Sequence, residues 1–379
     1  MNNIIYLDYQ ATTPVDPRVT ESMLPFFSHK FGNPSSRSSF HGREASAALE
    51  FNRSIIAQYF YCTTEEIIFN SGATEGLNAI IRTVIEKRFK PQSNVVISAI
   101  EHSAVYKTVK SFEKFGVEVR TASVDSNGFI DLTNLESLID ANTLLCCVIH
   151  GNNEIGTIQN LNAITIITEN KKVPLLVDAV QTFGKFDFKD VINSIDYLVF
   201  TGHKIYAPKG IGGIYIKNGK NNKYIGSFNE GGGQEFGLRS GTVNIPSVVG
   251  LGTALQLFDV QDLSYMGHMS ELLLKAILAI SFETKINGSL EQRILGNVNV
   301  TFPGFNASDI MKGLTNFSLS TGSACSTGSF ESNRIHRAIG LTDEDSKSTL
   351  RFGVGRFSKP EEISLFSEHL LNVLTKLNR

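Results

Sequence analysis

The strongest constraint on the fold is a series of short, continuous apolar runs separated by longer amphipathic stretches, between about residues 45 and 258. The runs cover residues 67–69, 95–97, 144–149, 175–177, 197–200 and 213–216. Continuous apolarity indicates strands buried on both faces, as in a mostly parallel sheet covered by helices. Stretches such as residues 104–115 and 160–171 have the pattern of the covering helices. The chain is therefore predicted to be an α/β protein.

The pattern changes after about residue 252. A helix is expected over residues 265–279, shorter strands over 297–302 and 348–353, and a last helix from near Pro360. With 379 residues the chain exceeds the ~250–300 residues at which single cores stop growing. We therefore predict a large α/β domain over residues 15–257. Residues 1–14 and 258–379 are expected to form a smaller α+β domain.

Composition excludes several classes of protein. A formal net charge of −2 argues against direct nucleic-acid binding or a membrane surface. The N-terminus has no basic or long apolar segment, and no apolar run reaches the ~20 residues of a membrane span. The four cysteines lack metal-ligand spacing, and the adjacent Cys146 and Cys147 are expected to pack in a core. These features predict a cytoplasmic protein with no metal site.

Polar residues follow five of the apolar runs directly. They occupy residues 70–75, 101–102, 151–154, 178–181 and 201–204. Ligands of open α/β sheets bind outside the carboxyl ends of the strands, because the loops converge there. Five successive runs with such endings predict a single site.

The residue types at these endings indicate a cofactor. Residues 71–74 open a helix whose free amides suit a phosphate. Lys204 at a strand end can form a Schiff base, and Asp178 can hold a positive charge on a ring nitrogen. Each alone has an ordinary explanation: a surface lysine, or an N-cap or turn aspartate. Together they predict pyridoxal phosphate.

Motifs along nearly the whole chain resemble the cysteine desulfurases of the NifS/IscS type, in the class V aminotransferase family of pyridoxal-phosphate enzymes. They occupy residues 6–14, 31–36, 71–75, 152–156, 202–210, 322–325 and 351–357. The resemblance implies fold type I, with a seven-stranded, mostly parallel sheet. It also implies conversion of L-cysteine to L-alanine by a homodimer with shared active sites.

The resemblance assigns roles to individual residues. Lys204 would carry the cofactor, Asp178 would pair with its ring nitrogen, and His102 would stack on the ring and move protons. The remaining cofactor-binding residues would be Ala73, Thr74, Asn153, Gln181, Thr201, His203 and, from the partner subunit's copy of the chain, Thr242. The substrate carboxylate would be bound by Asn33, Asn153 and Arg351.

Cys325 completes the implied mechanism. It lies among small residues in a loop at about 320–335, where an inert packing cysteine is unexpected. Its thiolate would take the substrate sulfur as a persulfide and pass it to an acceptor protein. The acceptor stays open between iron–sulfur cluster assembly, tRNA thiolation and DNA phosphorothioation, since the chain ends at Arg379 without the longer tail of some relatives.

Two other readings stay open. The same scaffold serves aminotransferases and selenocysteine lyases, and an inactive sulfur-relay partner could retain the fold.

The chain also departs from the family at Phe236, usually arginine, and at Gln10 and Ser39. All three lie outside the expected catalytic set, so activity is still predicted.

Overall fold

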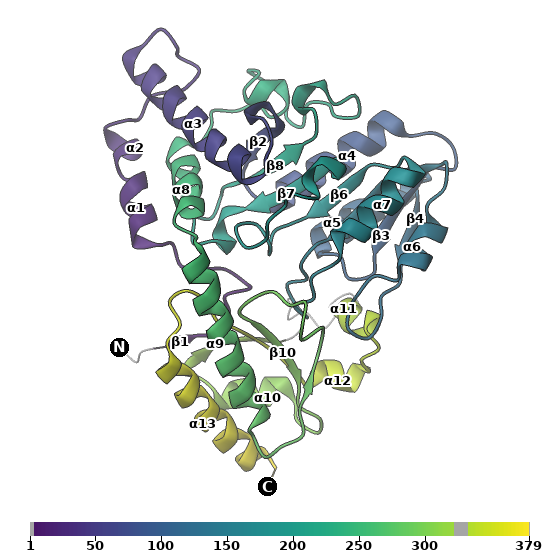
Figure 1. Ribbon diagram of the computed structural model, residues 1–379, viewed down its shortest axis with the longest axis vertical. Helices are drawn as coiled ribbons and strands as arrows, with labels where there is room; N and C mark the ends of the chain where they lie inside the picture. The colour runs from purple at the N-terminus through teal and green to yellow at the C-terminus, as the bar shows by residue number, and fades with distance from the viewer. Residues whose placement is uncertain (1–3, 322–332, 379) are drawn as a thin grey trace.

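The structure is a computed structural model that describes residues 4–321 and 333–378 (Figure 1). Its largest sheet has seven strands in the order β2–β8–β7–β6–β5–β3–β4. All run parallel except β8, which is antiparallel to both of its neighbours. The strands are β2 (Ile67–Asn70), β3 (Asn94–Ser98), β4 (Glu118–Ala122), β5 (Thr143–Ile149), β6 (Leu175–Asp178), β7 (Tyr197–Thr201) and β8 (Gly212–Ile216). The predicted α/β fold with a mostly parallel seven-stranded sheet is confirmed.

Helices cover both faces of this sheet. One face packs on α3 (Phe40–Tyr59), α6 (Leu132–Leu138), α7 (Leu161–Lys171) and α8 (Ile245–Gln256). The other packs on α4 (Ala73–Arg88) and α5 (Ser103–Lys110). Cys146 and Cys147 on β5 are fully buried in opposite layers, so the prediction that they pack in the core is confirmed.

A second, four-stranded antiparallel sheet has the order β12–β13–β10–β9. Its strands are β9 (Lys285–Ile286), β10 (Asn297–Thr301), β12 (Ser320–Thr321) and β13 (Thr349–Gly353). It shares a hydrophobic core with α9 (Val260–Leu278), α10 (Ala307–Gly313) and α13 (Pro360–Leu377). The N-terminal strand β1 (Ile5–Tyr6) joins this core by pairing in parallel with β11 (Phe317–Ser318). The expected domain boundary at 257/258 falls between α8 and α9 and stays a prediction.

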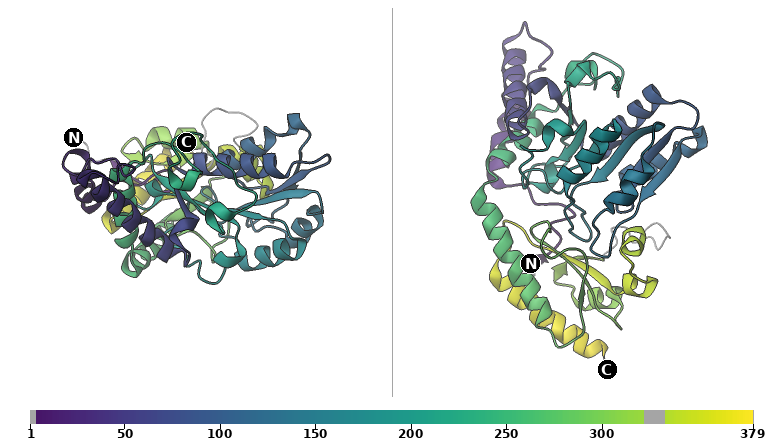
Figure 2. Two further views of the ribbon diagram at one scale, coloured as in Figure 1. Left: turned by 90° about the horizontal axis from the view of Figure 1, so that it is seen from above. Right: turned by 45° about the vertical axis from the view of Figure 1, so that its right-hand side comes forward.

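The views in Figures 1 and 2 show α9 running from the layers of the large sheet to the smaller one, where it packs beside α13. It begins five residues before the expected start, because Asp259 caps it in a capping box with Asp262. The other helices are α1 (Pro17–Met23), α2 (Pro25–Ser28), α11 (Arg334–Ala338) and α12 (Asp343–Lys347).

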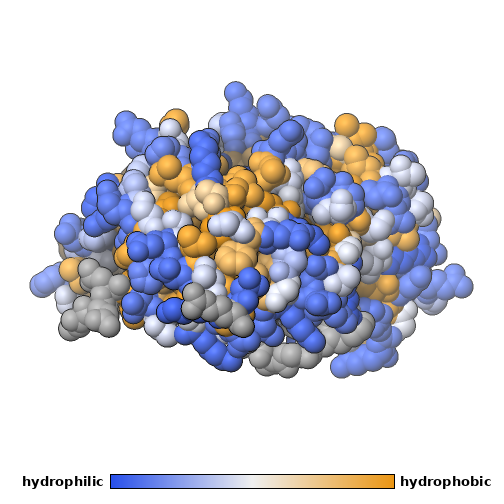
Figure 3. All heavy atoms as spheres, turned by 90° about the horizontal axis from the view of Figure 1, so that it is seen from below, coloured by the Kyte–Doolittle hydropathy of each residue, from blue (hydrophilic) through white to orange (hydrophobic). Residues whose placement is uncertain are grey.

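None of the helices in the described ranges has the length and apolar character needed to cross a membrane. At the lower end of the molecule, hydrophilic side chains surround apolar ones that gather near the middle of the face (Figure 3). Exposed apolar side chains interspersed in this way are usual on folded proteins.

Candidate active site

A cavity of about 670 Å³ lies where strands of the large sheet end. The structure brings to it predicted residues from all five polar segments. These are Ala73, Thr74, His102, Asn153, Asp178, Gln181, Thr201, His203 and Lys204. Segments far apart in the chain thus meet around one space, as expected for the carboxyl edge of a parallel sheet.

The turn between β2 and α4 forms one wall of this cavity. Gly72 has φ +144°, in the region that favours glycine, and its N–H donates to Asn70 Oδ1 at 2.9 Å. α4 begins at the next residue, at the cavity wall. The N–H groups of its first turn have no carbonyl partner within the helix, so they are suited to bind an anion. Glu75 accepts from the Ser71 N–H at 2.8 Å and pairs with Arg239 at 2.9 Å, which fixes the turn.

Lys204 ends a short 3₁₀ turn, Gly202–Lys204, directly after β7. Its Nζ donates to the backbone oxygens of Gln10 and Ala11, at 2.5 and 2.7 Å. Burial lowers the pKa of Lys204 to about 7, and the charges of Arg351 and Lys185 act in the same direction. A lysine with so low a pKa is a neutral amine in a large fraction of molecules near pH 7, and the neutral amine is the nucleophilic form.

Asp178 is the last residue of β6 and is buried, with Oδ1 accepting the Val180 N–H at 3.0 Å. Burial raises the pKa of this carboxyl, whereas the nearby His102 and Lys204 lower it. A buried carboxylate of this kind needs a cationic partner. A protonated ring nitrogen in the cavity would supply one.

His102 forms the N-cap of α5, where its Nδ1 accepts the Ala104 N–H at 3.1 Å. The proton of the neutral ring therefore sits on Nε2. Burial lowers the pKa of His102, which favours the neutral ring. A ring fixed in one tautomer can accept or return a proton without reorienting.

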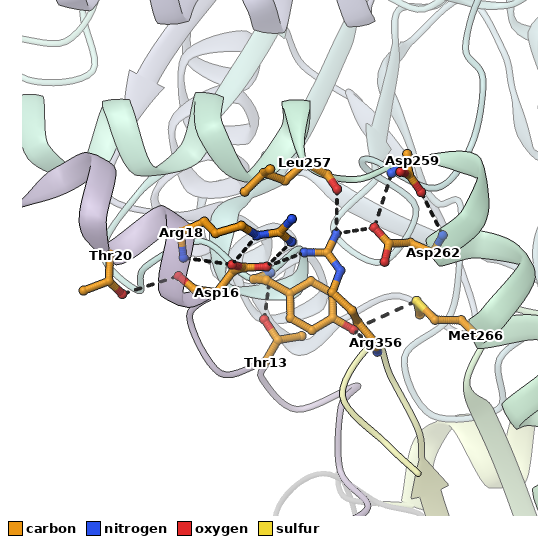
Figure 4. A network of polar contacts seen from close by, with 10 residues as sticks. Thr13, Asp16, Arg18, Thr20, Leu257, Asp259, Asp262, Met266 and Arg356 are labelled. Atoms are coloured by element: carbon orange, nitrogen blue, oxygen red, sulfur yellow. Dashed lines mark hydrogen bonds and ion pairs between the residues drawn. The ribbon is translucent and has the colours of Figure 1, made fainter. Parts of the chain in front are cut away.

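The turn that carries Lys204 is held by a polar network (Figure 4). Tyr206 has φ +66°, a left-handed conformation that a bulky residue rarely adopts. Its N–H donates to Thr13 Oγ1 at 2.8 Å, and its carbonyl accepts from the Asp16 N–H at 3.0 Å. Its hydroxyl accepts from the Arg356 N–H at 2.6 Å.

Arg356 links this turn to the α8–α9 junction. Its guanidinium pairs with Asp16 at 2.9 Å and with Asp262 at 2.6 Å (Figure 4). It also lies over the Tyr206 ring, 4.5 Å from the centroid. Arg356 and Asp16 are almost fully buried. Contacts on both sides of Tyr206 offset the cost of its unusual backbone and fix the position of Lys204.

Arg351 lies on β13 beside the cavity without lining it. Its Nη1 donates to the backbone oxygen of Asn153, a cavity residue, at 3.0 Å. Its Nη2 pairs with Asp8 at 2.7 Å. The guanidinium thus contacts a residue that lines the cavity, and its positive charge helps to lower the pKa of Lys204.

The family follows from comparison with known proteins. A model of the family described as aminotransferase class-V matches residues 5–366. The chain belongs to that family. Among curated relatives, the cysteine desulfurase IscS of Rickettsia prowazekii is 38% identical over 378 residues, 99% of this chain and 92% of that protein. IscS of Rickettsia bellii is 39% identical over 383 residues, covering 100% and 93%. The predicted resemblance to NifS/IscS-type desulfurases is confirmed.

Solved structures agree with the sequence comparison. A structure described as a NifS-like protein superposes with a TM-score of 0.89 at 33% identity, covering 98% of this chain and 99% of that one. A structure described as SspA in complex with cysteine gives a TM-score of 0.82 at 32% identity, covering 94% and 100%. The class V aminotransferases as a family use pyridoxal phosphate.

Three of the described residues expected from the family pattern do not line the cavity. Asn33 and Thr242 are exposed and do not line it, and Arg351 reaches it only through Asn153. Cys325 lies outside the described residues. The roles of all predicted site residues stay predictions. In the described part of the chain, no three His, Cys, Asp or Glu side chains gather as a metal site.

Glu101 is a site neighbour to which sequence reasoning assigned no role. It is fully buried beside His102, and its Oε1 accepts from Ser98 Oγ at 2.5 Å and from the Ile149 N–H at 2.7 Å. Burial raises its pKa to about 8. The available signal was a carboxylate shortly after a continuous apolar run, next to the buried Ile100, where a neutral residue is the usual choice.

The departure at Phe236 is part of a second buried arrangement. Arg53 on α3 pairs with Glu235 at 2.7 Å and lies between the rings of Phe69 and Phe236, at 4.9 and 5.1 Å. The aromatic ring of Phe236 therefore covers a buried cation, where an arginine would place a like charge. These contacts lie behind the β2–α4 turn, outside the cavity.

Proposed function

We propose that this chain is a pyridoxal-phosphate-dependent cysteine desulfurase that converts L-cysteine to L-alanine. The observation that carries the proposal is the arrangement of Lys204 and Asp178 around one cavity, at the N-terminus of α4. The Lys204 amine, whose pKa is lowered, suits the aldehyde of this cofactor, and the buried Asp178 carboxylate suits its ring nitrogen. The helix N-terminus suits its phosphate. The residues therefore fit the group.

Each side chain has a role in this proposal. Lys204 would bind the cofactor covalently, Asp178 would hold its ring nitrogen protonated, and residues 72–74 would hold its phosphate. When bound, pyridoxal phosphate acts as an electron sink for the bonds of the amino acid. His102, neutral and fixed by Ala104, would move protons at its Nε2.

Substrate binding would use the cations beside the cavity. Arg351 can receive the α-carboxylate with its planar donor geometry, and the amide of Asn153 would help to orient it. Asn33 is proposed as a further carboxylate ligand. SspA has been solved in complex with cysteine, which supports the same substrate here.

Cys325 is proposed as the sulfur acceptor within the chain. Its thiolate would bond to the substrate sulfur as the carbon–sulfur bond breaks, leaving a persulfide on Cys325 and alanine as the second product. The persulfide sulfur would then pass to an acceptor protein. Iron–sulfur assembly is the route suggested by the IscS relatives, and tRNA thiolation and DNA phosphorothioation are the alternatives.

We also propose a homodimer with shared sites. Thr242 is exposed, so its hydroxyl is free to approach the phosphate held by a second copy of the chain. Thr242→Ala should then weaken cofactor retention in a protein that light scattering shows to be dimeric. Full retention, or a monomer, would count against shared sites.

The direct test is product analysis with purified protein, L-cysteine and pyridoxal phosphate. Alanine and sulfide are expected from the wild type, and Cys325→Ala should lose both while still binding the cofactor. Keto-acid formation independent of Cys325 would identify an aminotransferase. Protein that takes up no cofactor would support an inactive sulfur-relay partner.

A further inference from the structure

Arg351 already has a carboxylate partner in the folded chain. Asp8 Oδ1 lies 2.7 Å from its Nη2, and the exposed fractions of the two side chains are 15% and 2%. Ser320 Oγ on β12 lies between them, donating to Asp8 Oδ2 at 2.6 Å and accepting from Arg351 Nη2 at 3.2 Å. The proposed substrate-binding cation is therefore neutralised by a residue of the N-terminal segment.

The position of Asp8 is fixed by backbone pairing. It forms a parallel bridge with Gly353 on β13, two residues from Arg351, and the neighbouring Leu7 carbonyl accepts from the Gly353 N–H at 2.7 Å. The backbone of Asp8 is thus held next to β13 independently of the ion pair with Arg351. The ion pair is part of the binding site, not a chance surface contact.

A substrate carboxylate arriving at Arg351 must compete with Asp8. Two carboxylates at one guanidinium repel each other, and desolvation strengthens that repulsion. Arg351 still has free donor capacity: its Nε is buried and has no hydrogen-bond partner among the described residues. Ser320 already donates to Asp8 Oδ2, so Asp8 keeps one hydrogen bond when its Oδ1 gives up Arg351.

We propose that Asp8 is an internal competitor for the substrate carboxylate, and that it sets the affinity of the site for amino acids. Between substrates it keeps the buried Arg351 paired. When an amino acid enters, Asp8 yields Arg351 to the incoming carboxylate and remains held by Ser320. This inference rests on the proposed function, because it assigns the carboxylate subsite of the same cavity to Arg351.

The test is the steady-state kinetics of Asp8→Asn. Asparagine keeps the size of Asp8 and one acceptor oxygen but removes its charge, so the KM for L-cysteine should fall about fivefold, with a smaller change in kcat. Inhibition by cysteamine, which carries the amine and thiol of cysteine without the carboxylate, should be unchanged. A raised KM, or an equal change for cysteamine, would overturn the proposal.

A matched control separates charge competition from the loss of an Asp–Arg pair elsewhere in the fold. Asp140→Asn removes the charge from the pair with Arg120, neither residue of which lines the cavity, and should not lower the KM. If Asp8→Asn does not fold, Ser320→Ala decides the matter. Without the serine, Asp8 depends more on Arg351, so the KM should rise at least twofold, and an unchanged or lower KM would contradict competition.

Calorimetric binding of L-alanine gives a readout that does not depend on turnover. Asp8→Asn should bind alanine about fivefold more tightly than the wild type, and unchanged or weaker binding would overturn the inference. Wild-type protein that makes no alanine from cysteine would count against the desulfurase function alone. The two failures are therefore distinguishable.

Discussion

The carboxylate of Glu235 accepts a hydrogen bond from the backbone N–H of Phe69, 2.7 Å away, at the open edge of the seven-stranded sheet. Within residues 4–321 and 333–378, β2 pairs only with β8, so no described strand adjoins this edge. Arg53, the ion-pair partner of Glu235, donates to the Ile67 carbonyl on the same edge at 2.7 Å. Two side chains thus replace a missing strand directly before the β2–α4 turn.

Glu235→Ala should lower the free energy of unfolding by about 3–5 kcal/mol, because it leaves the buried Arg53 and a strand N–H without their partner. Urea denaturation measures the change. Glu113→Ala, which breaks the exposed Lys110–Glu113 pair, is the control and should cost less than about 1 kcal/mol. Equal losses in the two variants would show that the edge contact contributes little.

Lys204 should capture pyridoxal phosphate at a rate that is half-maximal near pH 7. The neutral amine is the reactive form, and burial lowers the pKa of Lys204 to about 7. The capture rate, followed by absorbance after mixing with cofactor-free protein, should rise with pH through that midpoint and become flat at higher pH. A rate that keeps rising toward pH 10 would mean that Lys204 behaves as an ordinary lysine.

Lys185→Met provides the matched control for this pH dependence. The positive charge of Lys185 lowers the pKa of Lys204, so removing it should move the midpoint of the capture rate to higher pH. Lys275→Met changes a charge on the exposed surface of α9 and should leave the midpoint in place. Identical shifts in both variants would indicate a general charge effect.

Glu101→Gln should stabilise the protein most at alkaline pH. Burial raises the pKa of Glu101 from its ordinary value to about 8, so the folded state holds a proton that the unfolded state releases at lower pH. The contribution of this residue to stability therefore falls as pH rises between about 4.5 and 8. Glutamine does not ionise, so the Glu101→Gln variant does not lose this stability as pH rises.

Thermal unfolding at pH 5.5 and 8.5 tests the prediction for Glu101. The difference between Glu101→Gln and the wild type should grow in favour of the variant as pH rises. The exposed Glu271 provides the control, since Glu271→Gln should give no such trend. A difference that is constant with pH would mean that Glu101 is ionised in the folded protein throughout this range.

The sequence predicted those parts of the fold that depend on local pattern. The apolar runs around β3, β5, β6 and β7 were recognisable because both faces of these strands are buried. β4 was not predicted, because this edge strand is partly exposed and lacks a continuous apolar run. The polar strand ends that line the cavity followed from the parallel topology.

Contacts between distant segments could not be predicted in the same way. The pair Arg53–Glu235 joins residues 182 positions apart, and Asp8–Arg351 joins residues 343 apart. No spacing rule connects partners that lie so far apart in the sequence. Their pairing depends on how the two sheets and the N-terminal segment pack, which is information that the folded structure supplies.

The central claim is that Lys204 binds the cofactor covalently, and borohydride reduction followed by peptide mapping tests it most directly. After incubation with pyridoxal phosphate, reduction should fix the label on the peptide that contains Lys204, and Lys204→Ala should remain unlabelled. A label on another lysine such as Lys185 or Lys209, or a variant labelled as fully as the wild type, would contradict the account.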